Sequence, residues 1–314
     1  MNNIIKIVDI NTLVISGGAM KGLLYIGTLQ LLSELNILNK IKFYYGTSVG
    51  GILLTCINLG WDINDILKFS IKFPLDCLID LNIDNLGEIY GLVPHENYEI
   101  LFKKVISYKG HPENITFEEL YKSTNKELNL ITYSIKHNKC IALNYQTTPN
   151  LQLWKALHAT SSLPILVPPL EINDDIYIDG GITENFPIDR VKLENKNKMI
   201  GICSTPYKTD WDNILKNINN KNIINYFEYS IEILKILYYN AENYSNELCF
   251  KLDLSNKNGH YNLGLDETSK KDIIDIGYNQ AKEQINIIIE KLYLSQLKKI
   301  KTNNKNNYSK YNEI

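Results

Sequence analysis

Cysteine is scarce in this chain, and its few cysteines argue against a disulfide framework or a zinc site. Five occur among 314 residues, an odd number with no Cys-x-x-Cys pair: Cys56, Cys77, Cys140, Cys203 and Cys249. Disulfide-rich domains and structural zinc sites need cysteines in even numbers or at short spacing. We therefore expect buried thiols in a reducing compartment.

Long apolar runs are also missing. No run of about 18 apolar residues occurs, the length at which a segment becomes a candidate membrane span. The stretch from Met1 to Ile10 includes Lys6 and Asp9 and lacks the long apolar core of a signal peptide. We expect a cytoplasmic protein, either free or peripheral on a membrane, with no signal peptide and no transmembrane helix.

Basic residues do not outnumber acidic ones. Lysine and arginine together number 33, aspartate and glutamate number 35, and the net charge is −2. This balance argues against nucleic acid as the main partner. Arg190 is the only arginine, in a chain rich in asparagine, isoleucine and tyrosine, which indicates an AT-rich genome. The 44% of hydrophobic residues can bury the core of one large domain.

What the chain does contain is a serine between two glycines, at the junction of a predicted strand and a predicted helix. The apolar run 43–45 is followed by G-x-S-x-G, formed by Gly46, Ser48 and Gly50. Strand, sharp turn and helix are the context in which this pattern makes a nucleophile elbow. The glycines leave room for a strained turn, and a helix N-terminus favours negative charge developing at Ser48. The alternative is a tight turn with a capping serine.

A glycine-rich turn lies upstream, between another predicted strand and helix. The β-branched run 11–15 leads into Gly17, Gly18, Ala19 and Gly22, and helical spacing follows. Backbone amides in such a turn can point at an anion. The dinucleotide pattern fails because it needs glycine where Ala19 stands, and the P-loop fails because leucines follow Gly22. An oxyanion hole uses the same physics without these requirements.

An aspartate ends a third predicted strand, far downstream. The strand 176–179 ends at Asp179 and is followed by Gly180 and Gly181, which let the chain turn sharply. A carboxylate at a strand end can accept a serine proton as a general base. Taken alone, Asp-Gly-Gly is more typical of an ordinary turn.

Together the three motifs resemble the patatin-like phospholipase family. Members of that family have a G-G-G-x-[R/K]-G loop, then a G-x-S-x-G elbow, and Asp-Gly-Gly/Ala well over a hundred residues later. The motifs here follow that order and spacing. Residues 154–164 are similar to the family's A-x-x-A-[T/S]-S-A-x-P segment, and 184–187 to its N-x-P. The resemblance covers residues 10–205.

The resemblance implies a patatin-like three-layer α/β/α sandwich with a mostly parallel central sheet. It also implies a catalytic dyad that needs no histidine, metal or cofactor. Ser48 would be the nucleophile and Asp179 its base, with the amides of Gly17, Gly18 and Ala19 as the oxyanion hole. Ala19 departs from the family pattern, which has glycine there. Alanine does not easily take a left-handed backbone, so either the donor is misplaced or the position tolerates a methyl group.

A Ser-Asp-His triad of the α/β-hydrolase type is the competing arrangement. Its chain order is Ser, Asp, His, and only His260 follows Asp179. His260 lies in a polar, turn-like stretch, and an elbow this early suits patatin topology better. His158 is expected to pack near the site or to support it. Lys21 would either attract a phosphate head group or lie solvated in its loop.

Alternating strand-like and helix-like segments predict an α/β layout. Strands are predicted at 12–16, 41–45, 128–135, 140–146, 175–178, 198–203 and 247–253, and helices at 22–36, 49–60, 62–72, 96–107, 151–161, 211–218, 222–243 and 268–295. In the last helix Gly277, Ala281 and Ile285 repeat every four residues, a face suited to close packing. Residues 74–94 are expected to be the core of an insertion, or else a lid or membrane-contacting rim.

One domain is expected to account for most of the chain. Residues 10–205 would form the patatin-like catalytic core, and 206–295 would complete the same domain with helices and a strand. The polar, low-complexity segment 296–314 is expected to be a mobile tail.

These motifs and the resemblance predict a lipid acyl hydrolase of phospholipase A type that works through an acyl-enzyme intermediate. The expected substrate is a phospholipid or another acyl ester at a peripheral membrane surface, with a protein activator as an open option. Two alternatives remain. One is a soluble carboxylesterase or thioesterase on short acyl chains, and the other is a patatin scaffold that binds lipid or protein with weak or no turnover.

Overall fold

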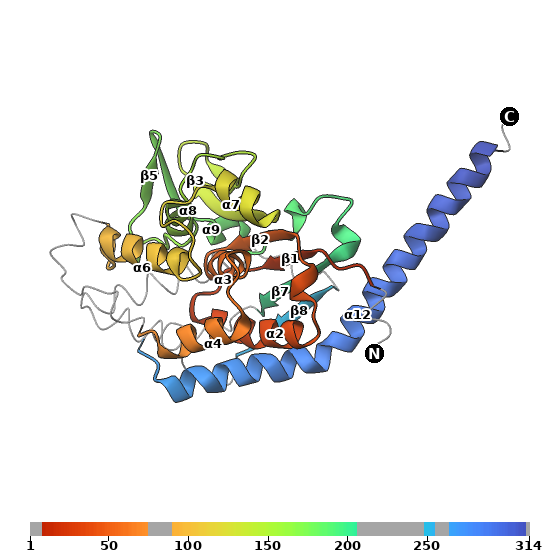
Figure 1. The fold of residues 1–314 in the computed structure, drawn as a ribbon, viewed down its shortest axis with the longest axis horizontal. Helices are drawn as coiled ribbons and strands as arrows, with labels where there is room; N and C mark the ends of the chain where they lie inside the picture. Colours follow the sequence, from red (N-terminus) through yellow and green to blue (C-terminus); the bar gives the residue numbers. More distant parts are fainter. Residues whose placement is uncertain (1–7, 75–89, 206–247, 255–263, 312–314) are drawn as a thin grey trace, which may run out of the picture.

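The structure, a computed structural model, describes residues 8–74, 90–205, 248–254 and 264–311, with 301–311 as backbone only. These residues form an eight-stranded sheet flanked by helices (Figure 1). The strands run in the order β5-β6-β3-β2-β1-β7-β8, and β4 pairs with β3 outside that path. The ladders among β3, β2, β1, β7 and β8 are parallel. The predicted α/β class with a mostly parallel central sheet is confirmed.

The strands follow the predicted order, with small shifts at their ends. They are β1 (Thr12–Ile15), β2 (Phe43–Thr47), β3 (Glu127–Ser134), β4 (Lys139–Leu143), β5 (Leu170–Ile172), β6 (Asp175–Asp179), β7 (Met199–Ser204) and β8 (Cys249–Leu252). The sequence did not predict β5, a three-residue strand that pairs only with β6. So short a segment leaves little alternating pattern to detect.

The helices also match the prediction wherever both can be compared, apart from two omissions. They are α2 (Gly22–Glu34), α3 (Val49–Asn58), α4 (Ile63–Lys72), α6 (His95–Ser107), α7 (Phe117–Thr124), α8 (Leu153–Thr160), α9 (Gly181–Glu184) and α12 (Glu267–Tyr311). The omissions are α7 and α9. The α7 signal was present as a capping box, in which Thr116 and Glu119 each accept the other's backbone amide.

Each face of the central strands has its own core. In β1, Leu13 and Ile15 belong to the large core that also takes in side chains of α2, α3 and α12. Val14 points to the opposite face, where it joins a smaller core with Phe186 and Ile188. Because both faces are covered, β1 is apolar at every one of these positions instead of alternating.

Helix α12 packs lengthwise against α2, and both lie beside α4 along one side of the molecule (Figure 1). The helices approach so closely that a Cβ on Gly277 would lie 2.1 Å from the Leu24 carbonyl oxygen. A Cβ on Gly27 would lie equally close to the Ile274 carbonyl oxygen, at 2.1 Å. The predicted close-packing face of the last helix is therefore confirmed at Gly277.

Side-chain amides of α12 also cover the edge of β8 that no strand of the described residues pairs with. Gln284 accepts the amide of Lys251 at 2.9 Å and donates to its carbonyl at 3.0 Å. Gln280 makes the same pair of bonds with Asp253, at 2.8 Å each. Two glutamines one helical turn apart therefore take the place of a neighbouring strand for Lys251 of β8 and for Asp253 just after it.

Some predictions lie outside the described residues. These are the helices at 211–218 and 222–243, most of segment 74–94, Cys77 and His260. The other four cysteines are free thiols, and of these Cys140 alone is not buried. Within the part of the chain that the structure describes, no helix has the length and apolarity to cross a bilayer.

The polar tail differs from its prediction in secondary structure. The sequence predicted a mobile tail over 296–314, whereas α12 continues as a helix to Tyr311 and projects beyond the body of the molecule (Figure 1). Composition missed this because asparagine-rich segments have weak intrinsic helix propensity. Whether the projecting turns move stays a prediction.

Candidate active site

Ser48 lies between β2 and α3 with a strained backbone. Its φ of 53° and ψ of −129° fall outside the regions that residues with a Cβ normally adopt. Such a conformation costs about 1–3 kcal/mol. The side chain is half-buried, and the Ser48 amide donates to Thr160 Oγ1 at 3.0 Å. This sharp strand-to-helix turn is the geometry that the G-x-S-x-G pattern predicts.

The two glycines of this turn are required by close contacts between backbones. A Cβ on Gly46 would lie 2.7 Å from the amide nitrogen of Gly51. A Cβ on Gly50 would lie 2.4 Å from the carbonyl oxygen of Ile15, at the end of β1. The start of α3 therefore rests directly on two strand ends, which holds Ser48 at the carboxyl edge of the sheet.

Strand β3 brings Asp179 next to the end of β2. Residues 130 and 131 pair with both β2 and β4, whereas 132–134 pair with both β4 and β6. Since a strand has only two edges, β2 and β6 must lie end to end along one edge of β3. Thr47 pairs with residue 131 and Asp179 with residue 132, so Asp179 and the residue before Ser48 occupy neighbouring places.

The Asp179 carboxylate is buried and held by backbone groups. Only 1% of the residue is exposed, and its Oδ1 accepts the Gly181 amide at 2.8 Å. The Asp179 amide donates to the carbonyl oxygen of Ser162 at 2.9 Å. A Cβ on Gly180 would lie 2.7 Å from the Ile131 carbonyl oxygen, so this glycine lets α9 begin directly against β3.

The glycine turn after β1 lies against Ser48. A Cβ on Gly17 would lie 3.3 Å from the Ser48 Cβ. The Gly17 amide donates to the Asn185 carbonyl oxygen at 3.0 Å, so this predicted donor is already engaged. Within the described residues no acceptor takes the N–H of Gly18 or Ala19. These two amides therefore remain as the candidate donors of the turn.

Ala19 takes the left-handed conformation that alanine was expected to resist. Its φ is 47°, at a cost of about 1–2 kcal/mol for a residue with a Cβ. The fold therefore accommodates the methyl group in a left-handed backbone at this position. Gly22 follows at the start of α2, where a Cβ would lie 2.5 Å from Val49 Cγ2. The N-termini of α2 and α3 thus meet beside Ser48.

Lys21 is neither solvated nor open to a head group, which corrects both of its predicted roles. It is 3% exposed, and its Nζ donates to Ser204 Oγ and to the Thr205 carbonyl oxygen, each at 3.3 Å. The Tyr25 hydroxyl donates to the Gly17 carbonyl oxygen at 3.0 Å. These side chains support the glycine turn from inside the protein.

Thr160 contributes to the site in a way that sequence reasoning missed. Its hydroxyl accepts the Ser48 amide and donates to the Ile131 carbonyl oxygen, so one side chain links the elbow to β3. The residue lies at the end of α8, in the segment 154–164 that the family resemblance includes. That segment marked the position, but no pattern indicated this pair of hydrogen bonds.

Arg190, the only arginine, ties the turn after Asp179 to β4. Its guanidinium donates two bonds of 2.6 Å to the Glu184 carboxylate and one of 2.9 Å to the Cys140 carbonyl oxygen. The Glu184 carbonyl oxygen in turn accepts the Thr47 hydroxyl at 3.1 Å. Arg190 therefore supports the segment that joins the Asp179 turn to the elbow.

His158 is fully buried and neutral. Burial, assisted by His95, lowers the pKa of His158 to about 4. Its Nε2 lies 3.2 Å from the Pro168 carbonyl oxygen, and its ring lies 5.1 Å from that of Tyr98. Burial and the Asp179 carboxylate both raise the pKa of Tyr98. His158 therefore has the packing role that was expected, beside a tyrosine that faces the site.

An apolar cavity of about 170 Å³ begins beside the elbow. Its wall includes Ala19 of the glycine turn and Val49, the residue after Ser48. Helices α2, α3, α4 and α6 supply most of the remaining wall, at Leu23, Ile26, Ile52, Leu53, Cys56, Ile66, Phe69, Ser70, Tyr98, Leu101, Phe102 and Val105. Nearly every one of these side chains is apolar.

The model of one protein family, described as patatin-like phospholipase, matches residues 13–192. Probable lipid hydrolase 463L of Invertebrate iridescent virus 6 is 34% identical over 207 residues, which cover 64% of this chain and 67% of that protein. Uncharacterized protein R571 of Acanthamoeba polyphaga mimivirus is 26% identical over 88% of this chain and 94% of its own. Triacylglycerol lipase 5 of Saccharomyces cerevisiae is 26% identical, over 57% of this chain and 27% of the yeast protein.

Two solved structures are similar in fold. VipD from Legionella pneumophila has a TM-score of 0.55 and 16% identity, with 88% of this chain and 67% of that chain covered. The type III effector protein ExoU has a TM-score of 0.52 and 15% identity, with 91% and 53% covered. At these identities the likeness shows the fold alone, and this chain spans about half of ExoU.

Proposed function

The chain belongs to the patatin-like phospholipase family, and from that premise we propose that it is a lipid acyl hydrolase of phospholipase A type. Relatives named lipid hydrolase and triacylglycerol lipase support the hydrolysis of lipid esters. The observation that carries the proposal is the shared edge of β3. Along that edge the strained turn at Ser48 adjoins the buried carboxylate of Asp179.

In this proposal Ser48 and Asp179 act as a dyad. Ser48 Oγ attacks the carbonyl carbon of the ester while Asp179 accepts the serine proton. The bond from the carbonyl carbon to the alcohol oxygen then breaks, and the proton passes from Asp179 to the leaving alcohol. Water that gives a proton to the same carboxylate attacks the acyl-enzyme, and the fatty acid leaves as Ser48 regains its hydrogen. The Gly181 amide holds the carboxylate in place throughout.

The negative charge on the tetrahedral oxygen needs donors that are already in position. The amides of Gly18 and Ala19 and the N-terminus of α3 are the candidates, because the glycine turn lies against Ser48 at Gly17 and α3 begins directly after Ser48. Loss of one such donor typically costs about 2.7–4 kcal/mol of transition-state stabilisation. The left-handed backbone of Ala19 supports its place in this set and weakens the case for an inactive scaffold.

The proposal is tested by hydrolysis of phospholipid vesicles and of short nitrophenyl esters. Ser48→Ala and Asp179→Asn should each lower turnover by about a thousandfold or more, as for other nucleophile and base residues. Ser107→Ala and Asp174→Asn change residues of the same types, a half-buried serine and an exposed aspartate, and should retain wild-type rates. A fluorophosphonate probe should label Ser48. Absence of labelling would argue against an activated nucleophile.

The remaining alternatives give different results in the same assays. Wild-type turnover of short esters alone would favour a soluble carboxylesterase or thioesterase, and no turnover of either substrate would favour a binding scaffold. His260→Ala should leave activity intact under the dyad. A loss of several orders of magnitude would favour the Ser-Asp-His triad instead.

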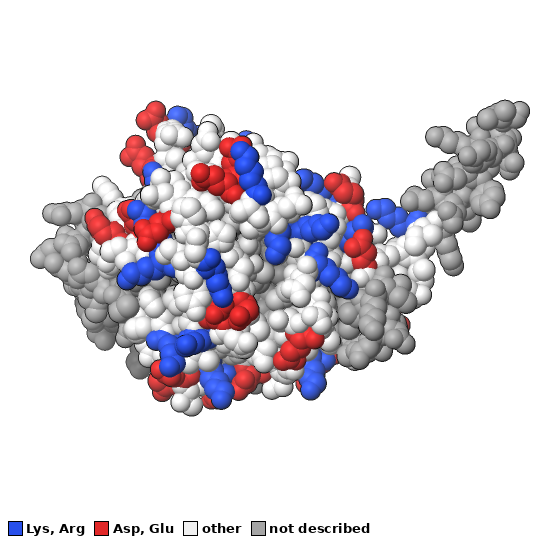
Figure 2. Space-filling model, viewed as in Figure 1, with Lys and Arg blue, Asp and Glu red and all other residues white. Residues whose placement is uncertain are grey.

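Peripheral membrane contact and protein activation are further parts of the proposal. On the face seen in Figure 2, basic and acidic side chains are interspersed, so no large field of one sign covers it. ExoU has been solved in a heterodimeric complex with SpcU, which is a property of that protein. Sedimentation with anionic and neutral vesicles tests whether this chain binds a membrane surface by itself.

A further inference from the structure

The cavity beside the elbow is built from matching stripes of three helices. Four side chains of the wall come from α3, four from α6, and four from α4 together with the residue that follows it. Within each set, the side chains lie three, four and seven residues after the first one. These stripes are 49, 52, 53 and 56; 66, 69, 70 and 73; and 98, 101, 102 and 105. Such spacing places four side chains along one face of a helix. Each helix therefore lines the cavity along two full turns.

The cavity has one end at the site and another away from it. On α3 the stripe begins at Val49, directly after Ser48, and ends at Cys56. On α6 the stripe begins at Tyr98 and ends at Val105. The Tyr98 ring packs on His158 of α8, the helix whose Thr160 hydroxyl accepts the Ser48 amide. Seven residues of helix span about 10 Å. The lining therefore extends about 10 Å along the helices and is almost entirely apolar, as the binding of a hydrocarbon chain requires.

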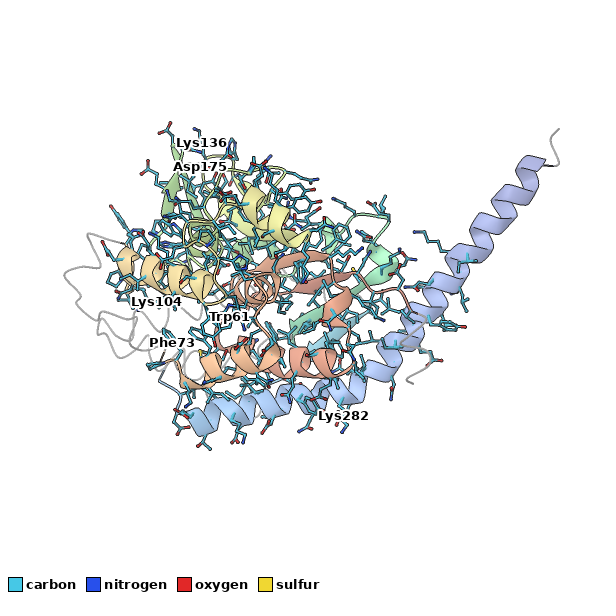
Figure 3. The ribbon with its side chains drawn as sticks, in the orientation of Figure 1. Trp61, Phe73, Lys104, Lys136, Asp175 and Lys282 are labelled. Carbon is cyan, nitrogen blue, oxygen red and sulfur yellow. The ribbon has the colours of Figure 1, made fainter. Side chains whose placement is uncertain are left out.

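Two aromatic side chains line the far end of the cavity. The Trp61 indole donates to the Val105 carbonyl oxygen at 3.2 Å, and its ring meets that of Phe69 edge-on at 5.5 Å. Trp61 is 5% exposed and so is fixed from several sides. In Figure 3 it lies between α4 and α6, and Phe73 lies at the end of α4. The far wall is therefore tightly packed.

We propose that this cavity binds the hydrocarbon chain of the acyl group, and that Trp61 and Phe69 at its far end limit that chain to about eight carbons. This inference rests on the proposed function, because the carbonyl carbon must lie at Ser48. Length and volume agree on the limit. An extended chain advances about 1.25 Å per carbon, from bonds of about 1.5 Å at tetrahedral angles, so about eight carbons span 10 Å. A cavity of about 150 Å³ holds the six carbons of benzene, so one of about 170 Å³ holds seven or so.

Binding of free fatty acids tests the cavity without any turnover. With Ser48→Ala protein, saturated acids from butyric to palmitic are titrated by calorimetry below their micelle concentrations. Affinity should rise about fourfold for each added methylene, up to about eight carbons, and then stop rising. Affinity independent of chain length, or a rise that continues to palmitic acid, would overturn the proposal.

Variants of the wall test which residues set the limit. Phe69→Ala, combined with Ser48→Ala, should move the break to longer acids, by about three carbons for the ring removed. Ile52→Phe fills the middle of the cavity and should move the break to shorter acids. Leu67→Ala is the matched control, since Leu67 is also partly buried on α4 but does not line the cavity. If Phe69→Ala fails to fold, Ile52→Phe still decides the question, and a break that neither variant moves would contradict the assignment.

Failure of this inference and failure of the proposed function can be told apart. If wild-type protein hydrolyses no ester but the fatty acids show the break, the cavity assignment stands and the hydrolase proposal falls. If esters of every chain length react alike and the titrations show no break, the hydrolase proposal stands and the cavity assignment falls.

Discussion

At the scale of single residues, the candidate site depends on backbone conformations that side chains seldom adopt. Ser48 and Ala19 both have positive φ, although neither is glycine. Each is held by close packing around it, Ser48 through Gly46 and Gly50 and Ala19 through the buried support of Lys21. Conformations of this cost persist only where the surroundings over-determine them. The packing therefore holds both residues in backbone conformations that cost stability.

His158 should make the protein less stable below neutral pH. Burial lowers its folded-state pKa to about 4, against about 6.5 for an unfolded histidine, so the unfolded chain binds more protons between these values. The stability that His158 contributes is complete above about pH 6.5 and is lost as the pH falls toward 4. Between about pH 7.5 and about pH 5 the loss amounts to about 2 kcal/mol.

Urea unfolding at these two pH values measures that loss. His158→Gln keeps a donor for the Pro168 carbonyl oxygen but cannot titrate. The difference in unfolding free energy between the two pH values should therefore be about 2 kcal/mol smaller in the variant than in wild type. Equal pH dependence in both proteins would show that the imidazole does not remain neutral inside the fold.

At the scale of elements, the short helix α9 connects the two halves of the candidate dyad. It begins two residues after Asp179, and its last residue, Glu184, accepts the Thr47 hydroxyl next to Ser48. Arg190 holds Glu184 with a forked pair of bonds. A forked guanidinium fixes direction as well as distance, which a lysine ammonium cannot do.

Arg190→Lys should therefore lower kcat and leave KM almost unchanged. Loosening α9 shifts Asp179 relative to Ser48, and a tenfold loss in kcat corresponds to about 1.4 kcal/mol. Initial rates over a range of ester concentrations separate the two constants. Lys192→Arg is the matched control, because it exchanges the same two residue types at an ion pair away from Glu184. A change in thermal stability with kcat unaltered would reduce Arg190 to a structural role.

Much of this arrangement could be predicted from sequence because glycines report close contacts. Gly46, Gly50 and Gly180 each sit where a Cβ would strike backbone, and their spacing around Ser48 and Asp179 identified the elbow and the strand end. The parallel sheet followed from buried apolar runs such as β1. These signals are local, so each can be recognised within one short segment of the sequence.

Other parts could not be predicted because they depend on contacts between distant segments. The Thr160 hydroxyl meets Ser48 across 112 positions, and the Lys21 ammonium meets Ser204 across 183. Nothing near Lys21 in the sequence indicates that it is buried. The engaged amide of Gly17 was missed for the same reason, since its acceptor is Asn185. Pairing of this kind is fixed only once the sheet has assembled.

At the scale of the whole molecule, α12 joins regions that lie far apart in the chain. It packs on α2, and its glutamines cover the edge of β8. Gln296 bonds the amide and carbonyl of Asp9 in the same manner, at 3.2 and 2.8 Å. An uncovered strand edge is a template for pairing with another chain, and proteins protect such edges with charges, bulges or a covering element.

Removal of these glutamines should expose β8 and cause self-association. In Gln280→Ala/Gln284→Ala the amides and carbonyls of Lys251 and Asp253 lose their partners, while the fold keeps the apolar contacts of α12. The variant should unfold at nearly the same urea concentration as wild type, because hydrogen bonds at exposed positions contribute only about 1 kcal/mol each or less. Light scattering after size exclusion should nevertheless show dimers and larger species that increase with concentration.

The control is Lys282→Ala/Glu283→Ala, which alters two exposed residues of the same helix. Lys282 is marked in Figure 3, and this variant should keep the wild-type mass. If both double variants keep that mass at every concentration, then edge pairing is prevented by something other than these side chains, and the twist or shortness of β8 becomes the explanation to examine.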